Sequence, residues 1–195
     1  MDQSGASFGP GHSCSAQSQS SLSLPFGECP SRGSAVISPC GVYRYRLERD
    51  GHGLDKTAVI MVNPSTANAE QDDATIRKLL GFGKRNAWGR IIVGNLFAYR
   101  ATDVRELAAA DDPVGPENDA HLKCIIYSVP RVIFAWGPTA KLPKRLRDRW
   151  REVDAMVRSA QHQPYCIAGP AQDGQPRHPL MLAYHSPIIP WRPPA

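Results

Sequence analysis

The residues that directly follow the short apolar runs of this sequence are mostly polar. The candidate ligand contacts after the first two runs are Asn63, Pro64, Ser65, Thr66, Asn95 and Arg100. Arg177 and His178 are two further candidates, later in the chain. An asparagine amide offers a donor and an acceptor on one rigid plane, so it can hold a water molecule or read the edge of a nucleobase. A histidine beside an arginine tends to stay neutral and can donate a hydrogen bond to a carbonyl oxygen. These residue types predict a site for a ligand the size of a nucleotide.

Several of these residues also have a structural interpretation. Asn63-Pro64 is a common turn-forming pair, and His178 suits a structural hydrogen bond as well as a ligand contact. Ser65 lies in neither a GxSxG nor a phosphate-loop sequence, which argues against a nucleophile. Asp72 and Asp73 precede a predicted helix, where capping is a better interpretation than a metal site. The spacing of the remaining cysteine and histidine residues suggests no metal, and neither a metal nor a cofactor is predicted.

The stretch 141–151 is the densest positive segment of a chain whose formal net charge is +5. It contains Lys141, Lys144, Arg145 and Arg149, which we expect on a helix face that contacts nucleic-acid phosphates. The alternative is a solvated helix face without a ligand.

Composition divides the chain into a tail and one domain. Residues 1–39 are rich in Ser, Gly, Pro and Gln and carry too few apolar residues to offset the entropy of ordering, so we predict a disordered tail. Residues 40–195 suffice for one domain with its own core. The five cysteines show no disulfide or zinc pattern, the first residues lack a signal-peptide pattern, and the apolar runs are strand-sized. We therefore expect a cytoplasmic protein without a membrane span, of unknown oligomeric state.

Short, continuous β-branched runs have the composition of parallel strands that are buried on both faces. They lie at 57–62, 90–95 and 131–136. Alternation of apolar and polar residues at 43–48 predicts a further strand at an edge of the sheet, and residues 165–168 predict another. The Pro-rich segment 176–194 is expected to be irregular.

Helical patterns separate these strands. The first helix starts with Asp72 or Asp73 as its N-cap, and a short second helix opens at Asp103 with the spacing of a capping box. A third begins near Pro116, and a fourth covers 138–160. The alternation predicts a single three-layer α/β domain with a mainly parallel twisted sheet and helices on both faces. Ligands bind beyond the carboxyl ends of the strands in such sheets, which is where the polar residues lie.

Five ordered blocks of the sequence resemble the domain of unknown function 1643 family. They are VIMVNPSTANAEQDDATIRK, VGNLFAYRAT, DPVGPEND, AWG and RHPLML. The resemblance covers about residues 41–192, and it names a family that has no established activity.

The order of the blocks is also similar, more distantly, to the uracil-DNA glycosylase superfamily. That resemblance implies a parallel sheet with helices on both faces and assigns roles to three residues of this chain. Asn63 in VNPS would position the attacking water, Asn95 in VGNLFAYRA would read the base edge, and His178 would donate to a base carbonyl. The strand RVIFAWGPTA is similar to a later block of the superfamily. The residue after Pro179 is Leu180, where the superfamily has a serine.

The leading prediction is a glycosylase-like domain that binds a nucleobase or nucleotide, in DNA or free. Cleavage of an N-glycosidic bond needs a base held by edge contacts and stacking, with stabilisation of a cationic sugar and an anionic leaving base. Phe97 is the aromatic residue expected to stack on the base. Two alternatives remain, namely a non-catalytic nucleic-acid-binding module that uses the 141–151 helix, and a hydrolase that uses Ser65 with His178.

Overall fold

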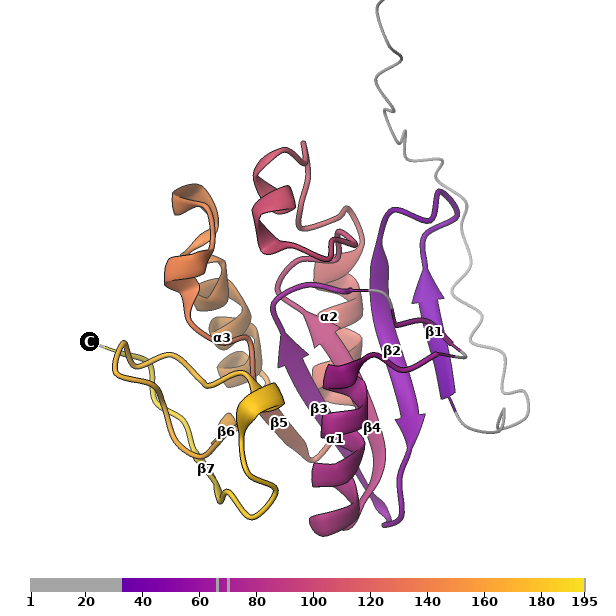
Figure 1. The fold of residues 1–195 in the computed structure, drawn as a ribbon, viewed down its shortest axis with the longest axis vertical. Helices are drawn as coiled ribbons and strands as arrows, with labels where there is room; N and C mark the ends of the chain where they lie inside the picture. Colours follow the sequence, from indigo (N-terminus) through magenta and orange to yellow (C-terminus); the bar gives the residue numbers. More distant parts are fainter. Residues whose placement is uncertain (1–32, 66, 70, 195) are drawn as a thin grey trace, which may run out of the picture.

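The computed structural model describes residues 33–65, 67–69 and 71–194, which form one mixed sheet with helices on both faces (Figure 1). The strand order is β1-β2-β4-β3-β5-β6-β7. The strands are β1 (Gly33–Ile37), β2 (Arg44–Asp50), β3 (Asp55–Met61), β4 (Trp88–Asn95), β5 (Arg131–Phe134), β6 (Tyr165–Ile167) and β7 (Ile188–Pro190). The helices are α1 (Ala74–Arg85), α2 (Asn118–Tyr127) and α3 (Arg149–Ser159).

The sheet is parallel only in its centre. Strands β4, β3, β5 and β6 run parallel, whereas the pairings β1–β2, β2–β4 and β6–β7 are antiparallel. The expectation of a mainly parallel sheet is therefore wrong, because half of the six pairings are antiparallel. It relied on the continuous β-branched runs and overlooked β7, which forms within the Pro-rich segment that was expected to be irregular.

The domain begins before residue 40. Residues 33–37, which composition placed in the tail, form β1 and pair with β2 from Gly33 opposite Arg49 to Ile37 opposite Arg44. Strand β2 consequently has a neighbour on each side, so the expectation that it lies at the edge of the sheet is wrong. The rest of the predicted tail, residues 1–32, lies outside the described residues.

The predicted helix caps are confirmed where they can be compared. Asp73 is the N-cap of α1, and its Oδ1 accepts a hydrogen bond of 2.8 Å from the N–H of Ile76. Asp72 instead binds the Nε of Arg49 at 2.6 Å. The short 3-10 helix Val104–Ala108 carries the capping box that was predicted from Asp103. Local sequence thus fixes both helix starts that border the site described below.

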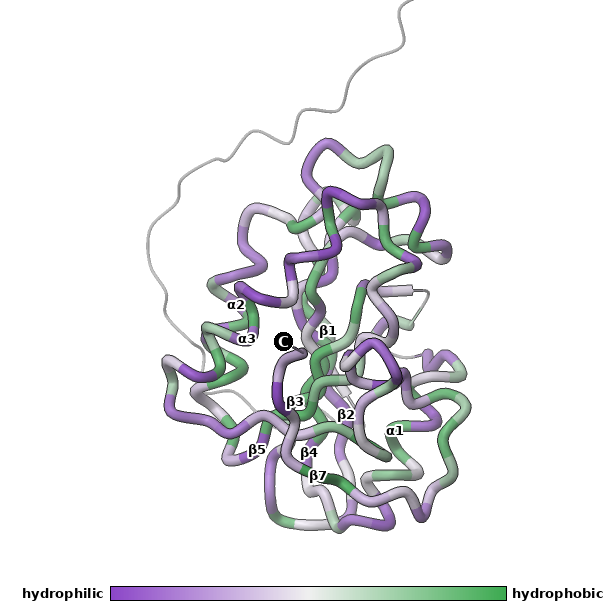
Figure 2. Tube along the Cα trace, turned by 90° about the vertical axis from the view of Figure 1, so that its left-hand side faces the viewer, coloured by the Kyte–Doolittle hydropathy of each residue, from purple (hydrophilic) through white to green (hydrophobic). Residues whose placement is uncertain are grey.

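Two hydrophobic cores separate the layers. On one face α1 buries Leu79 and Phe82 in a core that also contains Val59 of β3. On the other face α2 and α3 contribute Leu122 and Val153 to a core that includes the next residue of β3, Ile60, and all of these side chains are inaccessible to solvent. Figure 2 shows α2 and α3 on the opposite side of the sheet from α1. No helix in the described ranges has the length and apolar character that a membrane span requires.

The segment 138–160 is not one helix. It consists of 3-10 turns at Thr139–Lys141 and Lys144–Leu146, followed by α3. Pro143 lacks a backbone N–H and disfavours a helical conformation at the residue before it, and Leu142 is extended at φ −77° and ψ 151°. The basic residues of 141–151 are therefore distributed over two turns and a helix start, and they do not share one helix face.

Candidate functional site

The order in which the chain adds strands to the sheet reverses between β3 and β5, while the strands themselves stay parallel. From β3 it passes through α1 to β4 on one side, and from β4 it returns through α2 across β3 to β5 on the other. In the parallel centre Met61 pairs with Asn95, and Ile60 pairs with Phe134. The carboxyl ends of the three strands therefore lie at the same edge, at the kind of switch point where open α/β sheets bind ligands.

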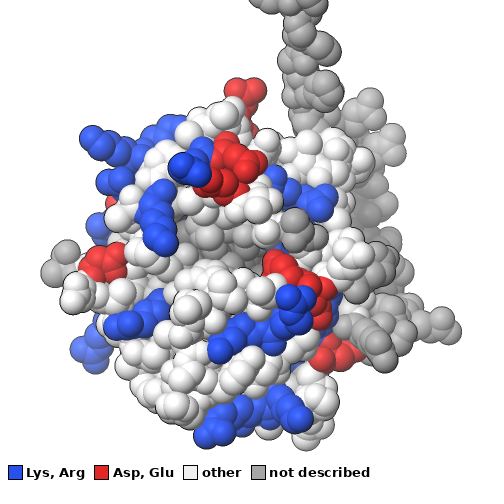
Figure 3. Space-filling model, viewed as in Figure 1, with Lys and Arg blue, Asp and Glu red and all other residues white. Residues whose placement is uncertain are grey.

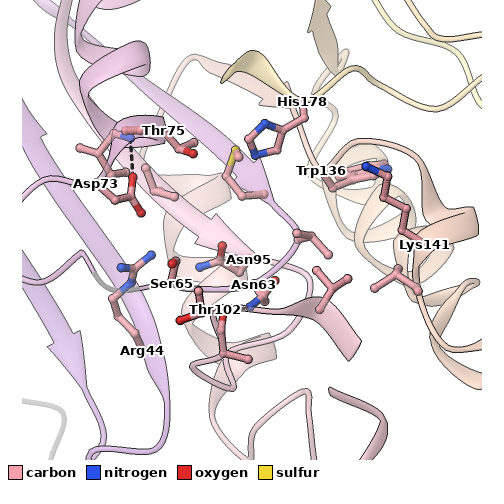
Figure 4. Close-up of a pocket in the computed structure, with 18 of the residues that line it drawn as sticks. Arg44, Asn63, Ser65, Asp73, Thr75, Asn95, Thr102, Trp136, Lys141 and His178 are labelled. Atoms are coloured by element: carbon pink, nitrogen blue, oxygen red, sulfur yellow. Dashed lines mark hydrogen bonds between the residues drawn. The ribbon is translucent and has the colours of Figure 1, made fainter. Parts of the chain in front are cut away.

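A cavity of about 440 Å³ lies at this edge (Figure 4). Its volume falls within the range of roughly 300–1,000 Å³ that is usual for small-molecule sites. Its walls come from the ends of β3, β4 and β5, from the start of α1 and from the segment that contains His178. The polar or charged residues that line it are Arg44, Asn63, Ser65, Asp73, Thr75, Asn95, Thr102, Lys141 and His178. The structure thus brings the three residues of the predicted site, Asn63, Asn95 and His178, to one cavity.

Asn95 is the last residue of β4 and lies near the centre of the view in Figure 4. Its side chain is 1% exposed, and neither the amide nitrogen nor the amide oxygen has a hydrogen-bond partner in the described part of the chain. Behind it, Asn118 donates from Nδ2 to the backbone oxygens of Asn95 and Leu96 at 3.1 and 3.2 Å. A buried polar group without a partner costs roughly 1–3 kcal/mol. The amide of Asn95 is therefore available for a ligand that supplies both an acceptor and a donor.

Asn63 follows β3, and its hydrogen bonds show the structural role that its turn-forming pair with Pro64 suggested. Its Nδ2 donates to the backbone oxygen of Ala101 at 2.7 Å and to that of Pro64 at 3.1 Å, which holds the turn and orients the amide. No donor among the described residues reaches its Oδ1. This oxygen is free to accept a hydrogen bond from a water molecule or a ligand at the cavity wall.

The hydrogen bonds of His178 define its tautomer. Its Nδ1 accepts from the N–H of Leu180 at 3.3 Å, so in the neutral ring the proton lies on Nε2. Burial lowers the pKa of His178; Asp73 opposes this shift and Lys141 adds to it. At neutral pH the ring is accordingly an uncharged Nε2 donor, suited to a carbonyl oxygen of a ligand.

Gly137 allows the loop after β5 to approach His178. Its φ of +81° belongs to the left-handed region that favours glycine, and a Cβ there would lie 3.2 Å from the Cβ of His178. Its N–H donates to the oxygen of Pro176 at 3.0 Å, which connects the two segments. This glycine positions the imidazole against the carboxyl end of β5.

The aromatic wall of the cavity is Trp136 and not Phe97. Trp136 lines the cavity, and its Nε1 donates to the Oε1 of Gln175 at 2.9 Å. Phe97 is fully buried in the core on the α2 and α3 side, so the expectation that it stacks on a ligand is wrong. After Asn95 the chain continues beside the segment that follows β3, because the N–H of Phe97 donates to the oxygen of Val62. This backbone path directs the ring of Phe97 into the core.

The other predicted contacts are divided between the cavity and its surroundings. Ser65 lines the cavity, whereas Pro64 is buried beside it and does not line it. Arg100 lines a smaller adjoining cavity. Arg177 is exposed and lines neither of them, so its ligand contact stays a prediction. Thr66 lies outside the described residues.

Two of the four predicted phosphate contacts have partners within the protein. Arg149 is 7% exposed, forms ion pairs with Asp119 and Glu152, and donates from Nε to the oxygen of Leu96 at 3.2 Å. Arg145 donates from Nη2 to three backbone oxygens of the segment that follows Asp103. For Arg149 the prediction is wrong, because its guanidinium links α3 to α2 and to Leu96, the residue after β4.

The other two predicted phosphate contacts are Lys141, which lines the cavity, and Lys144, which is exposed. Figure 3 shows acidic side chains between the basic ones on the face that it draws. The stretch does not present the single positive helix face that the sequence suggested, because it is not one helix and its Arg145 and Arg149 have partners within the protein.

Arg44 is the main functional candidate that sequence reasoning missed. The alternating pattern at 43–48 indicated a solvent-facing side chain, yet Arg44 is 3% exposed and lines the cavity. Its Nη1 donates to the backbone oxygen of Ala67, so a segment between β3 and α1, distant in sequence, lies against this side chain. No local signal in the sequence predicts this burial.

The cavity offers little for a metal or for a serine nucleophile. No group of three or more His, Cys, Asp or Glu residues in the described ranges is arranged to hold a metal ion. Ser65 and His178 line the same cavity, but the hydrogen bonds that the structure gives for His178 lead to the backbone of Leu180 and not to Ser65. Among the described residues, no hydrogen bond therefore links Ser65 to a base that could activate it.

Residues 44–180, more than half of the chain, match the family model described as "Protein of unknown function (DUF1643)". Searches of curated proteins and of solved structures returned no match.

Proposed function

Given that this chain belongs to the DUF1643 family, we propose from the chemistry of its cavity that it binds a nucleobase or nucleotide and hydrolyses an N-glycosidic bond. The observation that carries the proposal is the amide of Asn95, which is buried in the cavity wall without a partner. A buried amide is stabilised by a ligand edge that pairs an acceptor with a donor. The lactam edge of a nucleobase has this pattern.

The groups around Asn95 suit the remaining parts of such a base. The Nε2–H of His178 suits a second carbonyl oxygen, and this donor strengthens as negative charge develops on a departing base. The indole of Trp136 supplies an aromatic wall for stacking.

The oxygen of Asn63 suits the water that attacks the sugar. In the proposed reaction the water oxygen forms a bond to the anomeric carbon while the carbon–nitrogen bond breaks and its electron pair leaves with the base. The water loses a proton to solvent, and the departing base nitrogen gains one from solvent. Asn63 contributes position and not basicity, because an amide does not accept a proton at neutral pH.

The distant likeness to the uracil-DNA glycosylase superfamily is part of this proposal. Its support is that the three residues which the likeness assigns to water, base edge and base carbonyl line one cavity at the ends of parallel strands. Leu180, in place of the serine of that superfamily, argues for a base other than uracil.

The test combines binding with cleavage. Calorimetry with a panel of free nucleobases, nucleosides and nucleotides identifies the ligand, and Asn95→Leu is expected to abolish its binding. Release of the base is then measured from that ligand, and from single- and double-stranded DNA that contains uracil, hypoxanthine or hydroxymethyluracil. Asn63→Ala is expected to abolish release while retaining binding.

Asn86→Ala provides the matched control, because Asn86 is an exposed amide at the opposite end of α1. This variant is expected to bind and cleave as the wild type does. Binding without release of a base from any substrate would overturn the catalytic part of the proposal. Absence of binding, or binding that survives Asn95→Leu, would overturn all of it.

A further inference from the structure

A second cavity of about 380 Å³ adjoins the first. The two cavities share Ser65, Ala101 and Thr102 in their walls. Arg44 lines the first cavity, and Arg100 lines the second. In Figure 4 the guanidinium of Arg44 lies next to Ser65, on the same side of Asn95 as Thr102. Two arginines therefore flank a junction that is lined with hydroxyl groups.

The guanidinium of Arg44 is only partly satisfied by the protein. Nη1 donates to the backbone oxygen of Ala67, whereas the buried Nε has no partner in the described ranges. Burial lowers the pKa of Arg44 to about 10; Asp73 opposes the shift, and the charges of Arg100 and Arg49 add to it. Arg44 is nevertheless positively charged at neutral pH, and it has a second positive charge nearby.

Arg100 is in a similar position. Its Nη1 donates to the oxygen of Gly41 at 3.1 Å, and its buried Nε has no partner among the residues that the structure describes. Glu106 also lines the second cavity, but its carboxylate accepts from the N–H of Asp103. Neither Arg44 nor Arg100 forms an ion pair with a described carboxylate, and Asp73 is engaged as the N-cap of α1.

Two neighbouring guanidinium groups disfavour each other, and Asp73 offsets only part of the charge of Arg44. An anion bound between the two groups reduces the remaining penalty. Guanidinium groups suit phosphate in particular, because their parallel N–H groups match two phosphate oxygens. Hydroxyl groups such as those of Ser65 and Thr102 donate to the remaining oxygens.

Resting on the proposed function, we infer that the ligand is a free nucleoside monophosphate, with its base at Asn95 and its phosphate between Arg44 and Arg100. A phosphate that reaches Arg44, which is 3% exposed, must enter the junction of the cavities. A terminal phosphate does so without further groups. A backbone phosphodiester would bring the neighbouring nucleotide with it. Two arginines that the sequence suggested for holding a strand, Arg145 and Arg149, have partners within the protein.

The inference is tested by calorimetry with matched pairs of uridine, cytidine, inosine, guanosine and adenosine and their 5′-monophosphates. For the base that binds, the monophosphate is expected to bind at least tenfold more tightly than the nucleoside. Arg44→Gln and Arg100→Gln are each expected to remove this difference between the monophosphate and its nucleoside. Arg177→Gln, which removes an exposed arginine outside both cavities, is expected to retain it.

Folding of each variant is checked by thermal unfolding. If Arg44→Gln does not fold, Arg100→Gln alone tests the inference, because Arg100 is only half-buried. Nucleoside binding that depends on Asn95 but gains nothing from a phosphate would overturn this inference and leave the proposed function intact. Absence of any nucleoside or nucleotide binding would overturn the proposed function itself. Tighter binding of a single-stranded oligonucleotide than of the monophosphate, lost in Arg44→Gln, would assign the phosphate site to nucleic acid and overturn the inference.

Discussion

The backbone N–H of Leu180 donates to the Nδ1 of His178 at 3.3 Å, and this bond links a helical cap to the chemistry of the cavity. A protonated imidazole has no acceptor, so protonation would break the bond and add a charge beside Lys141. Burial, with a smaller contribution from Lys141, lowers the pKa of His178 against the opposing effect of Asp73.

We therefore predict that ligand affinity is constant from about pH 8 down to about pH 6.5, the usual pKa of histidine, and falls only in more acidic solution. Because the pKa of His178 is lower in the folded than in the unfolded chain, the unfolded chain binds the proton first. The contribution of the neutral His178 ring to stability is therefore complete above about pH 6.5, and it is lost as the pH falls through the pKa of the folded state.

The measurement is an NMR titration of the His178 ring together with affinity as a function of pH. His178→Gln retains a donor without a titrating group and serves as the control, with a flat pH profile. A His178 pKa above 6.5 would contradict the prediction.

We predict that Asn95→Leu raises the free energy of unfolding of the ligand-free protein by roughly 1–3 kcal/mol. The reason is that it removes two buried polar atoms that lack partners among the described residues. Asn118→Leu is the matched control. That change removes the donor to two backbone oxygens, and it also removes an Oδ1 that has no partner among the described residues. It is expected to lower the free energy of unfolding, because two buried oxygens lose their donor for one unpartnered atom removed. Urea unfolding measures both, and a clear loss of stability in Asn95→Leu would show that its amide has a structural role.

We predict that Gly137→Ala weakens ligand binding about tenfold, because the added Cβ displaces His178 from the cavity wall. Gly169→Ala is the control, since Gly169 has a similar φ of +76° but only an ordinary contact, 3.4 Å from a side-chain atom of Ile189. Both variants are expected to lose about 1–2 kcal/mol of stability from left-handed backbone strain. Equal ligand affinity in the two variants would show that Gly137 does not position His178.

We predict that Arg149→Met lowers the free energy of unfolding by roughly 1–3 kcal/mol, because the oxygen of Leu96 and two carboxylates lose a charged donor. Lys144→Met removes an exposed charge from the same stretch and is expected to change stability by less than about 0.5 kcal/mol. Chemical denaturation compares the two. If Arg149→Met changed the free energy of unfolding as little as Lys144→Met, Arg149 would again be a candidate for phosphate binding.

The sequence by itself determined the centre of the fold and the place of the site. The runs at 57–62, 90–95 and 131–136 correspond to β3, β4 and β5, and the caps at Asp73 and Asp103 are where the sequence predicts them. These signals are short-range, since β-branched composition and capping act within a few residues. Once the central strands are parallel, their carboxyl ends meet at one edge, which is why Asn63 and Asn95 could be predicted to share a cavity.

Only the tertiary structure decided which side chains the cavity and the core contain. Arg44 has the pattern of an exposed strand residue, yet it is buried, and its Nη1 donates to the backbone oxygen of Ala67 in the distant segment between β3 and α1. Phe97 follows the site in sequence, yet the chain beyond Asn95 continues beside β3 and directs it into the core. Burial depends on which distant segment covers a residue, and a local pattern carries no information about that partner.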